Sequence, residues 1–411
     1  MNLLVLTSIY PQPDDEKNIG VTPVVKYFCE EWVKQGHNVL VIHNSSYYPK
    51  LFYLLPDNII KKTNSKFGIV IPNKNQSKIL NTTCKGVRCY RLPMLKIIPK
   101  SIYTEKQVAS QFDKIESIIF GDGFKPDIII GHWENPQIQL IAKMKERWNI
   151  KSSLVFHGLV YINQKKYWNY LKDKINSLDV IGARSEAIAN ELKSIIDHKV
   201  APFICYSGIE NRYFHNIDNQ LSLINCKQFD SYLFVGRLIK RKNIDSIITV
   251  LNKIYLNEEF TLRLIGEGAE KEKLISIVEN LYRSDNIKFL GYKDHDEVIE
   301  YMAMTEVFIM ISDNETFGLV YIEAMSQGCA CISFDCTAGP REIINNNVDG
   351  ILVEDQNMDD MTLALSDLIE NEDKRERLAT EAIKSVDRFS VKNITDKWER
   401  LLVDVVDIKA D

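Results

Sequence analysis

Short apolar stretches alternate with amphipathic stretches along most of the chain. The apolar stretches are rich in Val, Ile, Leu and Phe, and few of them show a regular alternation with polar positions. These apolar stretches have the length of strands. The amphipathic stretches between them have the length and spacing of crossover helices. The pattern therefore predicts an α/β protein built from strand–helix–strand units.

The alternation runs twice, once in each half of the chain. In the first half the predicted strands cover residues 2–8, 37–43, 125–132, 151–158, 179–185 and 200–210. In the second half they cover residues 231–238, 260–268, 286–292, 307–313 and 329–335. We interpret the polar segment 216–230 as the linker between two domains. Doubly wound sheets bind ligands at the carboxyl ends of their strands, so functional residues are expected directly after strands.

Composition and charge narrow the class of protein. The 411 residues are 45% hydrophobic and 26% charged, which suits two globular domains, and the net charge of −5 argues against general nucleic-acid binding. The apolar runs are shorter than the roughly 18 residues of a transmembrane helix, and the first of them reads as a strand and not as a signal peptide. We therefore expect a cytoplasmic location. The eight cysteines show neither a C-x-x-C pair nor a zinc spacing, so we expect them to be reduced and mostly buried.

Positive charge is concentrated between Asn58 and Thr104, where ten Lys or Arg residues occur without any Asp or Glu. Apolar residues flank this segment on both sides. Segments that are both apolar and basic can lie on anionic lipid or meet a phosphate-bearing substrate. Lys61, Lys62 and Lys66 are our candidates for contact with an acceptor or a membrane. A solvated insertion rich in Lys and Asn is the alternative.

Two glutamates occur in the otherwise apolar and small-residue stretch 312–334. Glu315 follows a predicted strand, and Glu323 lies in the helix predicted to begin after Gly318. The free N–H groups and the dipole of a helix start suit a phosphate, and glycine allows its close approach. A carboxylate among apolar neighbours is costly to bury unless it accepts hydrogen bonds, and sugar or ribose hydroxyls are natural donors. The alternative is that both glutamates only favour the amino-terminal part of a helix.

Two cations, Arg237 and Lys242, follow another predicted strand at a spacing of five. Such a pair can neutralise a diphosphate, and a departing diphosphate needs this neutralisation as its bond breaks. Solvated basic residues in a loop are the alternative. Gly266 and Gly268 are not interpreted as part of a nicotinamide-dinucleotide site, because the third glycine is missing and the motif lies in the middle of the chain.

The second half of the chain resembles the C-terminal domain of the retaining glycosyltransferases of family 4, in the ordered segments VGRLIKRKNID, LIGEG, NIKFLGY, NETFGLVYIEAMSQG and PREII. The first half is similar in the loop at Gly20 and in GHNVLVI, FHG and SGIENRYF. The resemblance implies the GT-B fold, in which two doubly wound Rossmann-like domains face each other across a cleft. It further implies an acceptor-binding domain (1–210), a nucleotide-sugar-binding domain (211–388) and a final helix (389–411) that crosses back to the N-terminal domain.

The resemblance also implies roles for individual residues. Glu315 and Glu323 match the family's two glutamates separated by seven residues, of which the first lies against the donor sugar near the reacting carbon and the second holds the ribose. Arg237 and Lys242 match the basic pair on the donor diphosphate, and His157 matches a histidine that faces the donor sugar. The implied catalytic set is therefore Glu315, His157, Arg237 and Lys242. The other implied donor-binding residues are Gly20, Gly236, Tyr292, Thr316, Phe317 and Gly318.

Three positions depart from the family's pattern. Ser207 stands where an Asn-Gly turn is usual, the loop at Gly20 reads NIGV where paired glycines are common, and Asn243 replaces a common glycine after Lys242. A turn tolerates serine in place of asparagine. The NIGV loop leaves open how this part of the chain approaches the diphosphate.

The implied reaction moves a sugar from a nucleotide donor to an acceptor hydroxyl with retention of configuration, by front-face attack. A UDP-sugar is the favoured donor and GDP-mannose the alternative. The expected acceptor is a glycan or a lipid-diphosphate-linked glycan of bacterial surface polysaccharide synthesis, met at the anionic inner face of the membrane. Because cations and a helix start carry the diphosphate charge, no metal or other cofactor is expected.

Two other functions remain open at this point. One is a GT-B enzyme that acts on a soluble acceptor, which turnover on free sugars would favour. The other is a non-catalytic subunit of a glycosyltransferase complex. The set of Glu315, Glu323, Arg237, Lys242 and His157 argues against this second alternative, because a subunit that only binds a partner has no physical need for all five.

Overall fold

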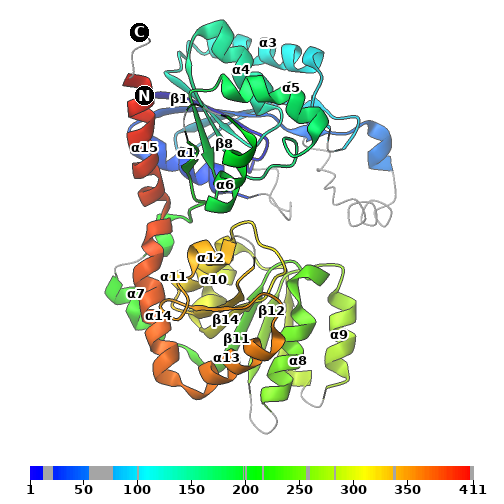
Figure 1. Cartoon of the computed structure of the whole chain (residues 1–411), viewed down its shortest axis with the longest axis vertical. Helices are drawn as coiled ribbons and strands as arrows, with labels where there is room; N and C mark the ends of the chain where they lie inside the picture. The colour runs from blue at the N-terminus through cyan, green and yellow to red at the C-terminus, as the bar shows by residue number, and fades with distance from the viewer. Residues whose placement is uncertain are drawn as a thin grey trace. The chain divides into compact units, whose positions relative to one another are not determined.

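The computed structural model describes residues 1–12, 22–54, 77–99, 101–197, 199, 201–214, 217–255, 260–281, 284–336 and 339–407. The chain forms two compact units, shown in Figure 1. The first unit comprises Met1–Tyr206 and Thr395–Asp411, and the second comprises Ser207–Ile394. The boundary after Tyr206 thus falls four residues before the domain boundary that we expected at residue 210.

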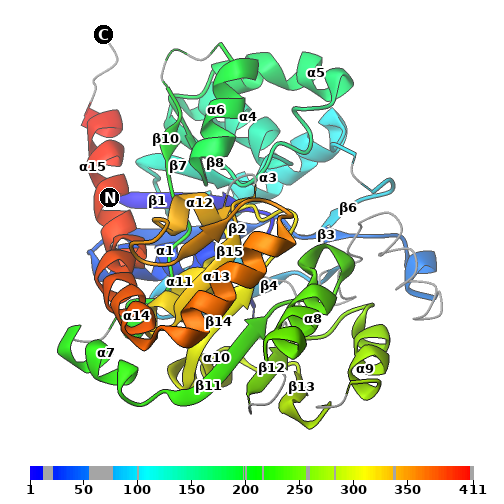
Figure 2. The same ribbon diagram turned by 60° about the horizontal axis from the view of Figure 1, so that its bottom comes forward.

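The first unit is built on an eight-stranded sheet of order β10-β9-β8-β7-β1-β2-β5-β4. Its strands are β1 (Asn2–Thr7), β2 (Asn38–His43), β4 (Leu80–Cys84), β5 (Val87–Arg91), β7 (Ile128–His132), β8 (Lys151–Phe156), β9 (Val180–Ala183) and β10 (Phe203–Ile204). A separate parallel pair joins β3 (Ser46–Tyr47) to β6 (Met94–Leu95), which lie side by side in Figure 2. Its helices are α1 (Val24–Lys34), η2 (Lys50–Leu54), α3 (Glu105–Gly121), α4 (Gln137–Trp148), α5 (Lys165–Asn176) and α6 (Glu186–Ile195).

All strand pairs of the first sheet are parallel except β4–β5. The central strands β1, β2, β7 and β8 are almost completely buried, as expected for a sheet with helices on both faces. Helices α3, α4 and α5 pack side by side in Figure 1. On α15 (Val391–Asp407), the indole of Trp398 packs edge-on against Trp32 of α1, with ring centroids 4.9 Å apart. Because β2, β5, β7 and β8 all run parallel to β1, their carboxyl ends lie at one edge of this sheet.

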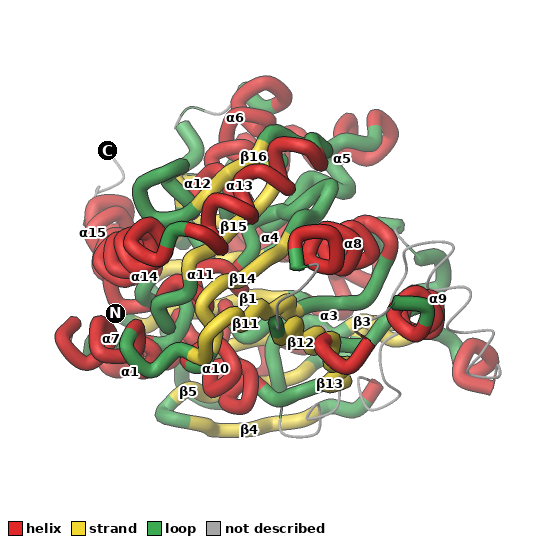
Figure 3. The backbone as a smooth tube through the Cα atoms, turned by 90° about the horizontal axis from the view of Figure 1, so that it is seen from below, coloured by secondary structure: helices red, strands yellow, loops and turns green. Residues whose placement is uncertain are grey.

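The second unit contains a six-stranded, entirely parallel sheet of order β13-β12-β11-β14-β15-β16, which Figure 3 shows from below. Its strands are β11 (Gln228–Val235), β12 (Thr261–Ile265), β13 (Ile287–Gly291), β14 (Thr305–Met310), β15 (Ala330–Phe334) and β16 (Ile351–Val353). Its helices are η4 (Asn211–Tyr213), α7 (Ile217–Ile224), η5 (Lys240–Lys242), α8 (Ile244–Ile254), α9 (Lys271–Glu279), η6 (Ser284–Asn286), α10 (His295–Ala303), α11 (Leu319–Ser326), α12 (Gly339–Ile343), α13 (Met358–Glu370), α14 (Glu372–Val386) and η7 (Asp387–Phe389).

The expectation of a polar linker at residues 216–230 was wrong. This segment contains α7 and the start of β11, and both belong to the second unit. Its polar side chains are tied into the unit, because the Gln220 amide donates to the Ser326 carbonyl oxygen at 3.0 Å and the Lys227 ammonium donates to the Met302 carbonyl oxygen at 3.0 Å. Hydrogen bonds to backbone carbonyls thus compensate the burial of polar groups that the sequence pattern suggested were solvated.

Candidate functional site

The best-defined polar cluster of the second unit joins Lys242, after β11, to Glu315, after β14. The Lys242 ammonium donates a hydrogen bond to the Glu315 carboxylate, and the side chains are only 8% and 13% exposed. Burial lowers the pKa of Lys242 below its ordinary value, although the Glu315 carboxylate acts in the opposite direction. The Arg241 guanidinium lies 3.6 Å from the same carboxylate but is half exposed. The sequence-predicted catalytic carboxylate and phosphate-binding lysine are therefore direct neighbours.

Asn243 locks the loops after β11 and β14 together. Its backbone is left-handed, with φ of 51°, a conformation that asparagine tolerates better than other residues with side chains. Its amide donates to the Ile311 carbonyl oxygen at 3.0 Å and to the Asp313 carboxylate at 2.5 Å. Asn243 thus adopts a backbone conformation that glycine also favours, and it adds two hydrogen bonds that a glycine could not make.

The start of α11 can bind an anion through its backbone. Gly318 precedes the helix with φ of 93°, and no side chain caps the free N–H groups of the first turn. Phe317 is buried and packs edge-on against Phe389, so only its backbone is available to a ligand. Thr316 is exposed. These three residues therefore present backbone groups and one hydroxyl near Glu315.

Glu323 is held by residues that the sequence analysis missed. Its carboxylate lies 2.9 Å from Nε2 of His295, and Nδ1 of the same imidazole is hydrogen-bonded to the Tyr213 hydroxyl. If the tyrosine donates to Nδ1, the Nε2–H donates to the carboxylate, which completes a consistent chain of donors and acceptors. No periodicity connects these residues, since His295 opens α10 and Tyr213 ends η4.

Three glycines bring the ends of β11, β12 and β13 close together. A Cβ atom on Gly266 would lie 1.9 Å from the Gly236 carbonyl oxygen, and the Gly266 N–H donates to the Gly291 carbonyl oxygen at 2.8 Å. The glycines at 266 and 236 therefore serve close backbone packing. Arg237 and Tyr292 follow this junction and are exposed, and Arg237 forms no ion pair with any residue that the structure describes.

His157 follows β8 in the first unit and is buried. Its Nε2 lies 3.0 Å from Nδ1 of His132, and its ring stacks on Trp133 with centroids 4.1 Å apart. Burial lowers the pKa of both imidazoles, so both are neutral near pH 7. His157 Nδ1 is buried without a hydrogen-bond partner in the described part of the chain, which leaves one polar atom for a ligand.

Glu134 is a second residue of the first unit that the sequence analysis did not identify. It follows β7, and its carboxylate accepts hydrogen bonds from the backbone N–H groups of Tyr161 at 3.0 Å and Ile162 at 2.9 Å. Burial raises its pKa to about 7, and these backbone donors oppose the rise. A carboxyl group near its midpoint of titration at neutral pH is typical of functional sites, although structural networks also produce it.

Some predicted residues lie outside the described part of the chain, namely Gly20, Lys61, Lys62 and Lys66. Among the described residues, no group of three or more His, Cys, Asp or Glu side chains is arranged to hold a metal ion. No helix in this part combines the length and apolarity that crossing a membrane requires. All eight cysteines are free thiols, and six of them are buried.

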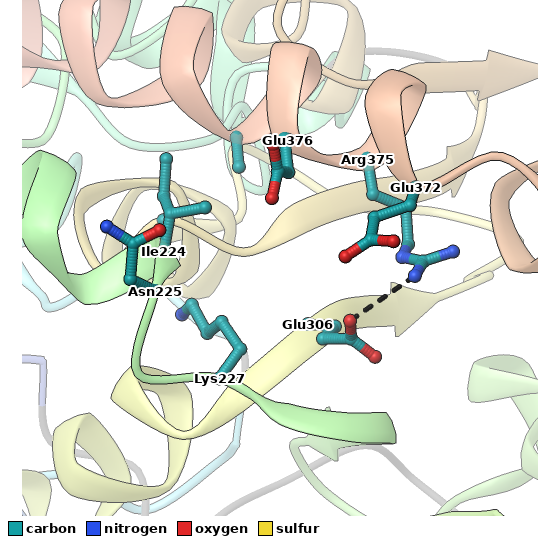
Figure 4. Close-up of a pocket in the computed structure, with 9 residues that line it drawn as sticks. Ile224, Asn225, Lys227, Glu306, Glu372, Arg375 and Glu376 are labelled. Carbon is teal, nitrogen blue, oxygen red and sulfur yellow. Dashed lines mark hydrogen bonds and ion pairs between the residues drawn. The ribbon is translucent and has the colours of Figure 1, made fainter.

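A cavity of about 260 Å³ in the second unit lies near the amino ends of β11 and β14, whereas Lys242 and Glu315 follow the carboxyl ends of these strands. Figure 4 shows residues that line the cavity. The Arg375 guanidinium in its wall pairs with Glu306 at 3.4 Å and donates to the Leu368 and Ile369 carbonyl oxygens at 2.6 Å. The Arg375 guanidinium in the cavity wall therefore caps the carboxyl end of α13 and has a structural role.

Residues 226–385 match the family model described as glycosyl transferases group 1. Over 374 residues, covering 89% of this chain and 96% of the relative, the chain is 26% identical to a glycosyltransferase of Methanocaldococcus jannaschii. It is 24% identical over 290 residues to the poly(glycerol-phosphate) alpha-glucosyltransferase of Bacillus subtilis, covering 67% of this chain and 41% of that protein.

The fold is also found in solved structures. A structure of the Anabaena protein HepE in complex with UDP and glucose superposes with a TM-score of 0.64 at 15% identity, covering 98% of this chain and 100% of that one. Residues 226–385 thus carry the match to the group 1 glycosyltransferases, and the chain as a whole has the GT-B fold of two Rossmann-like domains.

Proposed function

We propose that the chain is a retaining glycosyltransferase of family 4 that transfers a sugar from a nucleoside-diphosphate sugar to a glycan or lipid-linked glycan. The observation that carries this proposal is the largely buried Lys242–Glu315 pair beside the uncapped start of α11. A cation, a helix start and a carboxylate in one place suit a donor that combines a diphosphate with a sugar. A UDP-sugar is the favoured donor and GDP-mannose the alternative. The UDP and glucose bound to HepE support a uridine donor.

In the proposed reaction, the diphosphate of the donor binds Lys242, Arg237 and the backbone N–H groups after Gly318. As the bond between the anomeric carbon and the phosphate oxygen breaks, negative charge grows on the leaving diphosphate, and these donors stabilise it. The acceptor hydroxyl attacks from the same face and passes its proton to the leaving phosphate oxygen. We propose no metal for this step.

Glu315 is assigned to positioning and electrostatic stabilisation in this proposal, and not to nucleophilic attack. Its carboxylate is already engaged by the Lys242 ammonium, and a carboxylate held in an ion pair is a weakened nucleophile. When the diphosphate reaches Lys242, the negative charge of Glu315 lies beside the positive charge that develops on the sugar ring. Glu323 binds the ribose hydroxyls, and His157 binds a donor sugar hydroxyl through Nδ1.

For the acceptor, we propose a glycan or lipid-diphosphate-linked glycan of bacterial surface polysaccharide synthesis, met at the anionic membrane surface. Relatives such as the poly(glycerol-phosphate) alpha-glucosyltransferase of Bacillus subtilis support a phosphate-containing polymer as the acceptor. The exposed side chains of Leu51 and Leu54 follow β3, and those of Ile97 and Ile98 follow its partner β6, so exposed apolar residues follow both strands of this pair, as contact with a lipid would require.

The donor assignment is tested by thermal unfolding with UDP, GDP, ADP and their sugars, without added metal. A ligand at about 100 times its dissociation constant stabilises the native state by roughly 2.7 kcal/mol, which is readily measured. We expect stabilisation by one nucleotide class, lost in Glu323→Gln and retained in Glu279→Gln, an exposed control on α9. If none of the nucleotides or their sugars stabilised the chain, the proposed donor site would be refuted.

The membrane assignment has a separate test. Lys61, Lys62 and Lys66 are replaced together by Gln, and binding to vesicles that contain phosphatidylglycerol is measured by sedimentation. Reduced binding and reduced activity on a lipid-linked acceptor are expected, because about 1 kcal/mol of attraction is lost per cation near an anionic surface. Unchanged binding would contradict the proposal.

A further inference from the structure

Lys96 is a buried cation at the ligand-binding edge of the first sheet. It directly follows β6, and its backbone N–H donates to the Tyr47 carbonyl oxygen at 2.8 Å, which continues the parallel pairing of β3 and β6. These short strands in turn extend the carboxyl ends of β2 and β5. Tyr161 follows β8 at the same edge of the sheet. Doubly wound sheets bind their ligands outside the carboxyl ends of the strands.

The protein does not neutralise this cation. Lys96 is only 8% exposed, yet it forms no ion pair with any described residue, and its one hydrogen bond there joins Nζ to the Tyr161 hydroxyl oxygen at 3.0 Å. Two further N–H groups of the ammonium therefore have no acceptor in the described structure. Because a buried ammonium without an anionic partner is unfavourable, the position favours an anion that binds from outside.

Tyrosine rings surround the ammonium in place of carboxylates. Nζ lies 5.2 Å from the centre of the Tyr103 ring and 5.4 Å from that of Tyr161. Such rings attract a cation only weakly, so they leave most of its charge available to a ligand. Burial raises the pKa of Tyr48 to about 12 and raises that of Tyr103 as well, so their hydroxyls stay protonated and neutral. Since Tyr161 accepts from Lys96, its own hydroxyl hydrogen can donate to a ligand oxygen.

We propose that Lys96 and the Tyr161 hydroxyl bind a phosphate group of the acceptor substrate, an inference that rests on the proposed function. A compact ammonium with free N–H groups, next to an O–H donor, matches the several acceptor oxygens of a phosphate ester. Exposed Ile97 and Ile98 follow Lys96 directly and offer apolar surface beside the phosphate. The phosphate belongs either to a lipid diphosphate or to a sugar phosphate of a polymer, and the two sources share this site.

The test is isothermal titration of the full chain with the donor site saturated by UDP, so that added phosphate cannot bind there. The probes are farnesyl diphosphate, α-D-glucose 1-phosphate and, as an uncharged control, methyl α-D-glucoside. We expect at least one phosphate probe to bind and the glucoside not to bind. Tighter binding of farnesyl diphosphate would indicate a lipid diphosphate, and tighter binding of glucose 1-phosphate a polymer phosphate.

Variants separate this site from a structural role. Lys96→Met is expected to weaken binding of the phosphate probe at least tenfold and Tyr161→Phe about threefold, whereas Lys78→Met, an exposed lysine of the same basic segment, has no effect. Lys96→Met should keep or raise the melting temperature, because it removes a buried charge, whereas a structural cation would lower it. Lys96→Gln serves as the second variant if the methionine variant does not fold.

Two outcomes overturn the inference. One is a wild-type chain that binds UDP but neither phosphate probe, and the other is a Lys96→Met chain that binds the probe as tightly as the wild type. A wild-type chain that binds no nucleotide would refute the proposed donor site instead. The titration is then made without nucleotide, and equal binding of the phosphate probe by the wild type and Lys96→Met would again overturn the role of Lys96.

Discussion

The titration of Glu134 should make the first unit less stable as the pH rises through neutrality. Glu134 is 6% exposed, and burial raises its pKa from 4.5 to about 7. Between these two values the folded state binds more protons than the unfolded state, so the free energy of unfolding falls with increasing pH. The free energy of unfolding falls by about 1.4 kcal/mol per pH unit between these two pKa values, which amounts to about 3 kcal/mol in total. The loss is complete above about pH 8.

Glu134→Gln isolates this contribution. The Gln carbonyl oxygen can still accept from the Tyr161 and Ile162 N–H groups, but it does not ionise. We therefore expect the variant and the wild type to have similar stability near pH 5, and the variant to be more stable by about 3 kcal/mol near pH 8. Urea unfolding followed by tryptophan fluorescence reports on this unit alone, because all five tryptophans lie in it.

The control variant is Glu146→Gln, which changes an exposed glutamate on α4 of the same unit. Its stability should follow that of the wild type at every pH. The reasoning would be refuted if the Glu134→Gln and wild-type curves stayed parallel from pH 5 to pH 8, or if the wild type gained stability relative to the variant as the pH rose.

Three further predictions concern the second unit. Lys242→Met should lower the free energy of unfolding by about 3 to 5 kcal/mol, measured by urea unfolding followed by circular dichroism, because it leaves the largely buried Glu315 carboxylate without its cation. Adding Glu315→Gln should recover part of this loss, and additive effects of the two changes would contradict a coupled pair. Gly266→Ala should lower the free energy of unfolding by about 3 kcal/mol in the same assay, because its φ is 136° and its Cβ would collide with a backbone carbonyl oxygen. An unchanged midpoint of urea unfolding would show that the strands can separate to accommodate the Cβ. His295→Ala should weaken UDP binding about tenfold in titration calorimetry, because the Glu323 carboxylate loses the group that orients it; equal affinity would leave His295 without a role in binding.

Local features of the sequence were sufficient to predict the strand–helix alternation and the positions of Glu315 and Gly318 relative to their strand. Hydrophobic periodicity depends only on neighbouring residues, so it can be recognised without knowledge of contacts between distant parts of the chain. The same reasoning failed at residues 216–230, where polar residues hid α7 and the start of β11. Composition cannot distinguish a solvated polar side chain from one that is buried and satisfied by backbone carbonyls, as Gln220 is.

Which side chains meet was decided by the order of strands in each sheet. β11 lies beside β14 although β12 and β13 intervene in sequence, and this neighbourhood brings Lys242 to Glu315. β8 lies beside β7, which brings His157 to His132. The sequence by itself determined the α/β pattern, the glutamate pair and the basic segment, because these depend on residue type and spacing. Only the tertiary structure decided the partners of each charge, because strand order results from packing across the whole sheet.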